Sequence, residues 1–228
     1  MNMEKFISTE NLTKIYRKAE EEIRAVDGIT IHFRKGEFAA FYGTSGAGKS
    51  TLLYLIGGLG QPTEGKVVVD GVDLSTPDED RRAEFRREKI GFIFQFFYLL
   101  PTLTALENVL VPLVPLDLPK ENKVEKALEA LEKVGLSHRR NHLPGELSGG
   151  EQQRAVIARA LVLEPEIILA DEPTSDLDRK TAEAVIALLR DLNYQGHTII
   201  MATHDLRILD HASRCIGMED GKIVSDEG

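Results

Sequence analysis

The sequence has few of the features that mark secreted or membrane-spanning chains. Its single cysteine, Cys215, excludes an internal disulfide and fits a reducing cytoplasm. The N-terminal residues hold no apolar stretch long enough for a signal peptide. The most apolar windows, residues 92–100 and 109–118, are interrupted by polar residues or proline and fall well short of the roughly 20 residues that span a bilayer. We expect a chain that does not cross a membrane by itself.

Positive charge is also scarce. The 28 Lys and Arg residues are outnumbered by 37 Asp and Glu residues, which gives a formal net charge of −9. Because nucleic acid phosphates require a basic surface, we expect no nucleic acid partner. The shares of apolar residues (42%) and charged residues (29%) are those of an ordinary globular domain, and 228 residues suffice for one such domain.

Short apolar runs alternate with helical patterns along the chain. Strands are predicted at residues 38–42, 65–69, 90–94, 167–170 and 198–202, and helices at 49–57, 78–88, 122–134 and 179–192. Continuous apolar strands that alternate with helices indicate an α/β fold with a parallel sheet covered on both faces. Strand patterns disappear between residues 95 and 163. We predict one domain, residues 1–228, with a core of about 1–95 and 164–228 and a helical subdomain of about 96–163.

A glycine-rich loop follows the first apolar run. The segment Gly43-Thr-Ser-Gly-Ala-Gly-Lys-Ser50 matches the phosphate-binding loop pattern at every fixed position. Its glycines let successive backbone N–H groups point at phosphate oxygens, and the following helix adds its positive N-terminal end. Lys49 is expected to neutralise the β- and γ-phosphates, and Ser50 to bind Mg²⁺. The predicted nucleotide-binding residues are Gly43, Thr44, Ser45, Gly46, Ala47, Gly48, Lys49, Ser50 and Thr51.

An acidic pair ends a later strand. Asp171 and Glu172 directly follow the apolar run 167–170. The carboxyl ends of parallel strands face the ligand crevice, so Asp171 is placed to hold Mg²⁺. Glu172 then lies where it can polarise a water for attack on the γ-phosphate.

A second glycine-containing motif makes the assignment specific. The segment Leu147-Ser-Gly-Gly-Glu-Gln-Gln-Arg154 resembles the signature sequence of ATP-binding cassette (ABC) proteins. It opens a predicted helix, so its N–H groups form a second anion site. One fold cannot direct two such helix N-termini at one triphosphate across this chain separation. The resemblance implies a head-to-tail homodimer in which each signature acts on the opposite subunit's ATP, through Leu147, Ser148, Gly149, Gly150 and Glu151.

The remaining landmarks of the family follow in order. Gln95 resembles the glutamine that senses Mg²⁺ and the attacking water, and His204 resembles the switch histidine that contacts the γ-phosphate. Tyr16 resembles the aromatic residue on which adenine stacks. The segment 175–178 resembles the loop that crosses the dimer interface. The resemblance implies that Glu172, His204 and Gln95 are the catalytic residues. It also implies that Ser50, Gln95 and Asp171 bind the metal ion.

The resemblance covers essentially the whole chain and implies a fold and a function. The fold is α/β, with a P-loop NTPase core of mostly parallel sheet, an N-terminal antiparallel β region and an inserted helical subdomain. The function is ATP hydrolysis with ATP and Mg²⁺, coupled to a separate integral-membrane permease. Such a subunit lies in the cytoplasm, at the inner face of the cell membrane. Residues 92–109 are most similar to the branch that serves lipoprotein release, macrolide export and FtsE-like systems.

Other functions fit parts of the sequence. A Ras-type GTPase needs a guanine-reading loop, and the nearest match, residues 122–125, ends in Glu instead of Asp. A soluble cassette ATPase of DNA repair or chromosome structure inserts a long coiled coil or zinc-binding cysteines before the signature, and neither is present here. The ATPase subunit of a small-solute importer stays open, because importer cassettes share all the catalytic motifs.

Two positions depart from the family pattern, and one segment has a further expected role. Glu151 stands where Gln is most common, and Asp176 stands where a small residue is usual. Both are expected to affect dimer affinity or its salt dependence and to spare the phosphate chemistry. The apolar and aromatic segment 96–103 directly follows Gln95, so we expect part of it to receive a short helix of the permease. Tyr98 and Leu99 are the positions at which a polar substitution tests this.

Overall fold

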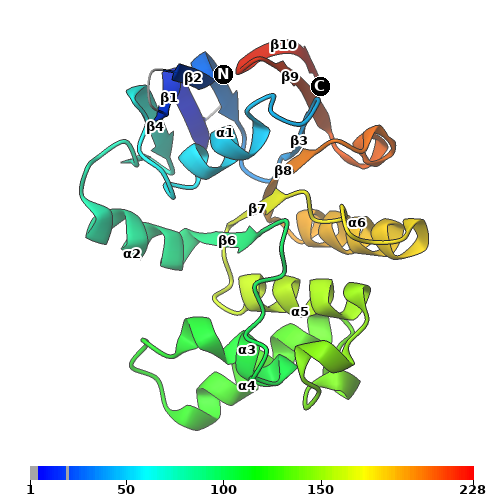
Figure 1. Ribbon diagram of the computed structural model, residues 1–228. Helices are drawn as coiled ribbons and strands as arrows, with labels where there is room; N and C mark the ends of the chain where they lie inside the picture. The colour runs from blue at the N-terminus through cyan, green and yellow to red at the C-terminus, as the bar shows by residue number, and fades with distance from the viewer. Residues whose placement is uncertain (1–4, 19–20) are drawn as a thin grey trace.

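The chain folds into two sheets and a helical layer, shown in Figure 1. The computed structural model describes residues 5–18 and 21–228. The first sheet is antiparallel and consists, in spatial order, of β2 (Glu21–Phe33), β1 (Ile7–Lys18), β4 (Glu64–Val69) and β5 (Val72–Asp73). The second sheet consists of β10 (Lys222–Glu227), β9 (Arg214–Glu219), β3 (Phe38–Tyr42), β8 (Thr198–Thr203), β7 (Ile167–Asp171) and β6 (Ile90–Ile93).

The second sheet forms the centre of the core. Its strands run parallel from β9 to β6, and only β10 is antiparallel to its neighbour. Side chains of β3 alternate between the two faces: Phe38 and Ala40 pack into one apolar cluster, and Ala39 and Phe41 into the other. This burial on both faces explains why the strands are continuous apolar runs. The α/β fold class predicted from the sequence is confirmed.

Helices cover the sheets and fill the stretch between β6 and β7. The helices are α1 (Lys49–Ile56), α2 (Glu79–Lys89), α3 (Ala105–Leu110), α4 (Lys120–Lys133), α5 (Gly149–Leu161) and α6 (Arg179–Tyr194). Short 3₁₀ turns occur at η1 (Val111–Leu113), η2 (Ser137–Arg139), η3 (Pro144–Glu146) and η4 (Leu206–His211). From β6 to β7 the chain forms helices and turns only, as expected for the helical insertion. None of the helices in the described residues is both long and apolar enough to cross a membrane.

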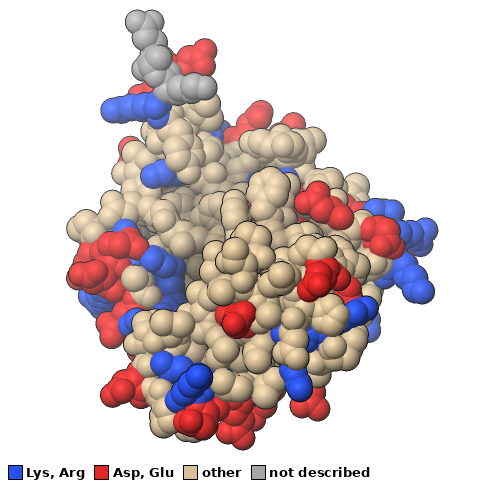
Figure 2. Space-filling model, turned by 60° about the horizontal axis from the view of Figure 1, so that its bottom comes forward, with Lys and Arg blue, Asp and Glu red and all other residues tan. Residues whose placement is uncertain are grey.

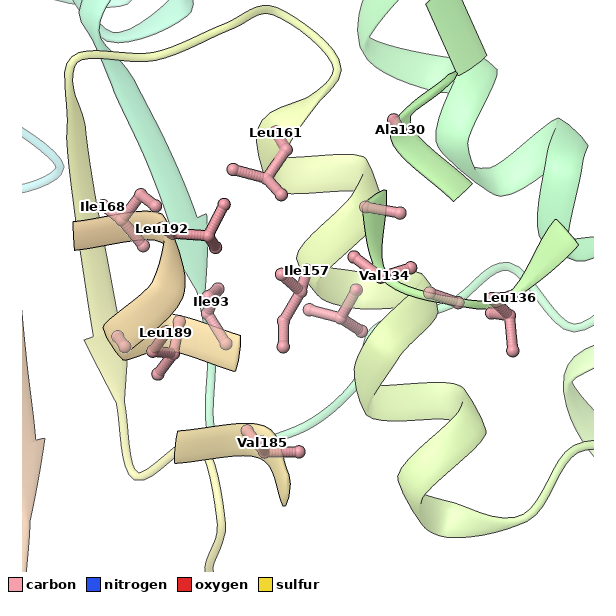
Figure 3. Close-up of a cluster of buried hydrophobic side chains, with 14 of the residues drawn as sticks. Ile93, Ala130, Val134, Leu136, Ile157, Leu161, Ile168, Val185, Leu189 and Leu192 are labelled. Carbon is pink, nitrogen blue, oxygen red and sulfur yellow. The ribbon is translucent and has the colours of Figure 1, made fainter. Parts of the chain in front are cut away.

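The helical insertion is anchored to the core through α5. Ile157 and Leu161 of α5 lie between the sheet with α6 on one side and the insertion on the other (Figure 3). On the insertion side they meet the cluster that contains Val134 and Leu136. The insertion comes forward in Figure 2, where acidic and basic side chains are interspersed around a mostly uncharged middle. A movement of the helical insertion relative to the core would therefore displace α5 first.

The bounds of the predicted elements hold to within one or two residues, whereas α3, β5 and the hairpin of β9 and β10 were not predicted. The hairpin of β9 and β10 has a weak apolar pattern, yet the dipeptide Asp220–Gly221 between its strands is a strong hairpin signal. Both residues have positive φ, 45° and 75°, as a two-residue hairpin turn of this kind requires.

Candidate functional site

A cleft of about 580 Å³ opens beside the N-terminus of α1. It brings together residues that are far apart in the sequence, from β1, the glycine-rich loop, and the carboxyl ends of β6, β7 and β8. Predicted site residues that line the cleft are Tyr16, Ser45, Gly46, Gly48, Lys49, Ser50, Thr51, Gln95, Glu172 and His204. Ala25 of β2 also lines it and was not predicted, because nothing in an alanine indicates a ligand contact.

The glycine-rich loop can take this shape only with glycine at two positions. Gly43 has φ +147°, and an added Cβ would lie 2.2 Å from the carbonyl oxygen of Met218. Gly48 has φ +97°, and an added Cβ would lie 2.0 Å from the carbonyl oxygen of Ala25. The chain thus curls tightly against β2 and β9 before α1 starts. A glycine-rich turn directly before a helix is the backbone arrangement on which anion sites are built.

Lys49 is held inside the loop. Only 5% of the residue is exposed, and its Nζ atom donates to the carbonyl oxygens of Gly43 and Thr44 at 2.8 and 2.9 Å. A buried ammonium satisfied only by neutral carbonyls can gain an anionic partner at little further cost of desolvation. Lys49 is therefore prepared to bind a phosphate.

Asp171 lies at the end of β7, next to α1. It is 2% exposed, and its Oδ1 atom accepts a hydrogen bond from the Ser50 hydroxyl at 2.7 Å. Its Oδ2 atom accepts one from the Tyr54 hydroxyl at 2.6 Å. A hydroxyl and a carboxylate in contact are oxygen donors of the kind that Mg²⁺ prefers, so Ser50 and Asp171 fit the expected metal. The sequence prediction did not include Tyr54, although its spacing of four residues from Ser50 places both hydroxyls on one helix face.

Glu172 and His204 contact each other in the cleft. Nδ1 of His204 lies 2.7 Å from Oε2 of Glu172, and the backbone N–H of His204 donates to the same oxygen at 3.3 Å. The Glu172 side chain is 12% exposed and that of His204 59%. Glu172 has φ +48°, a left-handed conformation uncommon for a residue with a side chain, and its N–H donates to the carbonyl of Ala202 at 2.9 Å. Such strain, held by neighbouring strands, is typical of functional positions.

Tyr16 lies at the other end of the cleft. Its residue surface is 48% exposed, and Nζ of Lys14 lies 5.4 Å from the centre of its ring. An exposed aromatic face with a nearby cation suits stacking of a base beside phosphates. Gln95, just past β6, is exposed to the cleft.

The signature residues lie outside this cleft. Among the described residues, the lining of the cleft includes none of Leu147, Ser148, Gly149, Gly150 and Glu151. Ser148 is instead the N-cap of α5, where its hydroxyl accepts from the N–H of Glu151 and the Glu151 carboxylate accepts from the N–H of Ser148. Arg139 of η2 donates to the other oxygen of Glu151 at 2.9 Å. The signature residues at the N-terminus of α5 are thus not part of the cleft that the same chain forms.

The fold and the cleft together define a nucleotide-binding P-loop domain. Comparison with known proteins agrees. The family model described as "ABC transporter" matches residues 26–175. An ABC transporter ATP-binding protein, YvrO of Bacillus subtilis, is 45% identical over 221 residues, which cover 97% of this chain and 96% of that protein. The cassette MJ0796 of Methanocaldococcus jannaschii is 45% identical over 226 residues, which cover 97% and 96%.

Solved structures and longer relatives add to this comparison. MJ0796 has been solved as a dimer in a post-hydrolysis state bound to ADP and Pi, and superposes with a TM-score of 0.90 over 97% of each chain at 43% identity. A macrolide export ATP-binding/permease protein of Hyphomonas neptunium is 46% identical over 222 residues, which are 97% of this chain but 34% of that protein. The chain thus spans about a third of the length of that relative. It belongs to the ABC transporter family and is an ATP-binding cassette with ATPase activity.

Proposed function

We propose that two copies of this chain pair head to tail around two ATP molecules and hydrolyse them to drive a membrane permease. The observation that carries the proposal is that the signature residues do not line the cleft that holds the phosphate loop. The cleft contains the phosphate loop, Glu172 and His204, while the N-terminus of α5 lies outside it. Only a second copy can bring an α5 N-terminus to the open side of the cleft. The related cassette MJ0796, solved as a dimer, supports this arrangement.

The residues of the cleft divide the chemistry between them. The loop N–H groups and Lys49 hold the phosphates, and Ser50, Asp171 and Gln95 would hold Mg²⁺, which neutralises charge on the phosphates when bound. Glu172 orients the attacking water and accepts its proton. His204 holds the Glu172 carboxylate through the contact at 2.7 Å. Tyr16 stacks on the adenine.

The variant Glu172→Gln tests the hydrolytic part. It keeps the shape of the side chain and removes its basicity, so turnover should fall by roughly 10²–10⁴ while ATP still binds. The trapped ATP-bound dimer should then elute ahead of the monomer on size exclusion. Near-normal turnover would contradict the role of Glu172, and a monomer with bound ATP would contradict the dimer. A matched control is Glu132→Gln, an exposed carboxylate on α4.

The permease is proposed to dock on the segment that follows Gln95. Phe96, Tyr98 and Leu100 are exposed by 59%, 64% and 46%, whereas Phe97 and Leu99 pack against the core. Arg159 of α5 donates to the carbonyl oxygens of Phe97 and Tyr98 at 2.9 and 2.6 Å, which ties the segment to the signature helix. A row of exposed apolar side chains suits the apolar face of a permease helix. The chain would thereby act in the cytoplasm at the inner face of the membrane.

The type of transport is proposed from the relatives. The macrolide export protein of Hyphomonas neptunium joins an ATP-binding region and a permease under one name. We therefore propose a permease of the export or lipoprotein-release type and not a small-solute importer.

Docking can be tested by comparing adjacent positions. Tyr98→Asp should abolish co-purification with the permease and leave the ATPase rate of the isolated subunit close to normal. On sequence alone, Leu99 was as good a candidate for docking as Tyr98. In the structure Leu99 packs against the core, so Leu99→Asp should instead lower stability and solubility. Retained co-purification of Tyr98→Asp, Phe96→Asp and Leu100→Asp variants would place the docking surface elsewhere.

A further inference from the structure

Tyr54 makes the shortest hydrogen bond to Asp171, and the proposed function assigns it no part. It lies on α1, four residues after Ser50, and its ring is half-buried. Ser50 and Tyr54 each donate to a different oxygen of the same buried carboxylate, at 2.7 and 2.6 Å. Each hydroxyl thus fixes one oxygen of the Asp171 carboxylate. Because both hydroxyls belong to α1, this helix sets the plane of the carboxylate.

The two hydroxyls are not equivalent. Ser50 belongs to the phosphate loop pattern, and its short side chain can turn its hydroxyl toward a metal ion by a change of rotamer about the Cα–Cβ bond. The Tyr54 hydroxyl is carried on a rigid ring. Tyr54 therefore keeps its hold on Oδ2 when Ser50 leaves Oδ1.

The Tyr54 ring also belongs to a row of aromatic contacts. Its centre lies 6.1 Å from that of Phe94, and Phe94 lies 5.8 Å from Tyr98 in an edge-to-face arrangement. Tyr98 is 64% exposed, on the segment proposed to receive the permease. The row thus connects a buried carboxylate of the cleft with the docking surface in two ring contacts, each within the range of favourable aromatic pairs.

We propose that Tyr54 is a positioning residue of the magnesium site, which holds Oδ2 of Asp171 so that Oδ1 faces the metal, and that its ring transmits the position of this carboxylate through Phe94 to Tyr98. The inference rests on the proposed role of Asp171 as a metal ligand. Partners that orient metal ligands in this way typically account for 10–100-fold in metal affinity.

The first experiment measures metal dependence of nucleotide binding. Binding of a fluorescent ATP analogue is followed while Mg²⁺ is titrated, and again in EDTA, for the wild type and three variants. Tyr54→Phe keeps the ring and removes the hydroxyl. It should raise the Mg²⁺ concentration at half-maximal binding by roughly 10-fold and leave binding in EDTA unchanged, because Lys49 and the loop are intact. An unchanged Mg²⁺ midpoint would overturn the positioning role.

Two other variants make the result specific. Tyr42→Phe is the matched control, because it also removes a tyrosine hydroxyl that bonds a side chain, here Ser225 at 2.8 Å, but not one at Asp171. Its Mg²⁺ midpoint should equal that of the wild type. Asp171→Asn tests the underlying proposal. If Asp171→Asn shifts the midpoint and Tyr54→Phe does not, the inference alone fails; if neither shifts it, the proposed metal role fails as well.

The second experiment measures transmission to Tyr98. The chain contains no tryptophan, so Tyr98→Trp introduces a single fluorescent reporter. Addition of Mg²⁺ with ATP should change its emission, and the change should be largely lost when Tyr54→Phe or Phe94→Leu is added at saturating Mg²⁺ and ATP. An equal change with and without Tyr54→Phe would refute the transmission. So would a reporter that does not respond when Tyr54 and Phe94 are both present.

Discussion

The N-termini of helices α1 and α5 are the two proposed anion sites of this molecule, and they are capped in opposite ways. Helix α1 starts after Gly48, which has no side chain to cap it, and its first turn contains no acidic residue. Helix α5 starts after Ser148 with a complete capping box, and its first turn contains Glu151. One N-terminus is left open and the other is satisfied by its own side chains.

The difference indicates how each site would be used. The open N-terminus of α1 keeps its N–H groups and its positive dipole for the phosphates of its own cleft. At α5 the Glu151 carboxylate accepts a hydrogen bond from the N–H of the N-cap residue Ser148, the Ser148 hydroxyl accepts one from the N–H of Glu151, and the charge of Glu151 offsets the dipole. Arg139 in turn offsets the carboxylate. The signature is thus stable as a free surface and would bind a triphosphate more weakly, as suits a contact that must open and close in each cycle.

The largest effect is expected at α1. Lys49→Ala removes the buried ammonium, so ATP affinity should fall by about 100-fold, the value of a strong charge-assisted hydrogen bond. ATP-driven dimerisation should disappear with it. The measurement is titration with ATP, and the control is Lys66→Ala, whose partner Asp73 lies at 3.5 Å in an exposed pair. If Lys49→Ala dimerised normally with ATP, the N-terminus of α1 would not differ from that of α5 as the phosphate site.

From the sequence one could predict which residues form the site at α1, but not which of their side chains contact each other. The phosphate loop, Asp171 and Glu172 could be placed because each follows an apolar strand directly, and strand order along the chain implies a common edge. The contacts between side chains could not be predicted in this way. That His204 meets Glu172 and that Tyr54 meets Asp171 depends on the packing of β8 and α1 beside β7. The capping by Glu151 could be predicted from the sequence, since Ser followed by Glu three residues later is a known capping pattern. The ion pair of Glu151 with Arg139 could not, because it depends on the position of the turn η2.

The second effect concerns Gly150 in the first turn of α5. A Cβ at this position would lie 2.3 Å from Cγ2 of Thr181 on α6. Gly150→Ala should therefore lower the free energy of unfolding by about 1–3 kcal/mol through overpacking, measured by urea denaturation. Thr181→Ser removes Cγ2 and keeps the hydroxyl that bonds Asp178, so the double variant should recover most of the loss. Gly145→Ala, with nothing within 4 Å of the added Cβ, should have little effect.

This pair of variants separates packing from ligand binding at the signature. If the double variant folds like the wild type and still fails to dimerise with ATP, the remaining defect belongs to the anion site itself. If it dimerises normally, Gly150 serves only the contact between α5 and α6.

A smaller effect is expected from the charge balance at α5. In the proposed dimer, Glu151 places a carboxylate near the partner's γ-phosphate, and Arg139 offsets it. Arg139→Ala should weaken ATP-driven dimerisation several-fold at low salt, on the scale of a partly exposed ion pair. Glu151→Gln in the same chain should restore it. Lys126→Ala, which breaks the pair with Glu164 at 2.7 Å on the insertion, should change nothing. Equal losses in Arg139→Ala with and without Glu151→Gln would show that charge is not the cause.

The smallest effect is a change of stability with pH. The N–H and hydroxyl of Ser148, together with Arg139, lower the pKa of Glu151 from 4.5 to about 2. A carboxyl whose pKa is depressed in the folded state adds stability that is fully present above the unfolded pKa and is lost as pH falls through the folded one. The advantage of the wild type over Glu151→Gln should therefore be constant near neutral pH. This difference in stability should shrink between about pH 4.5 and 2. The other carboxyl groups titrate in both proteins, so their effect on stability cancels in the comparison.

The capping box of α3 provides the comparison for this measurement. Glu107 accepts hydrogen bonds from Thr104 as Glu151 does from Ser148, and these bonds lower its pKa, but no arginine contributes to the shift. Glu107→Gln should therefore show a change in the same direction. If the stability difference between the wild type and Glu151→Gln does not vary with pH, the carboxylate does not stabilise α5, and the satisfied N-terminus differs from the open one in shape alone.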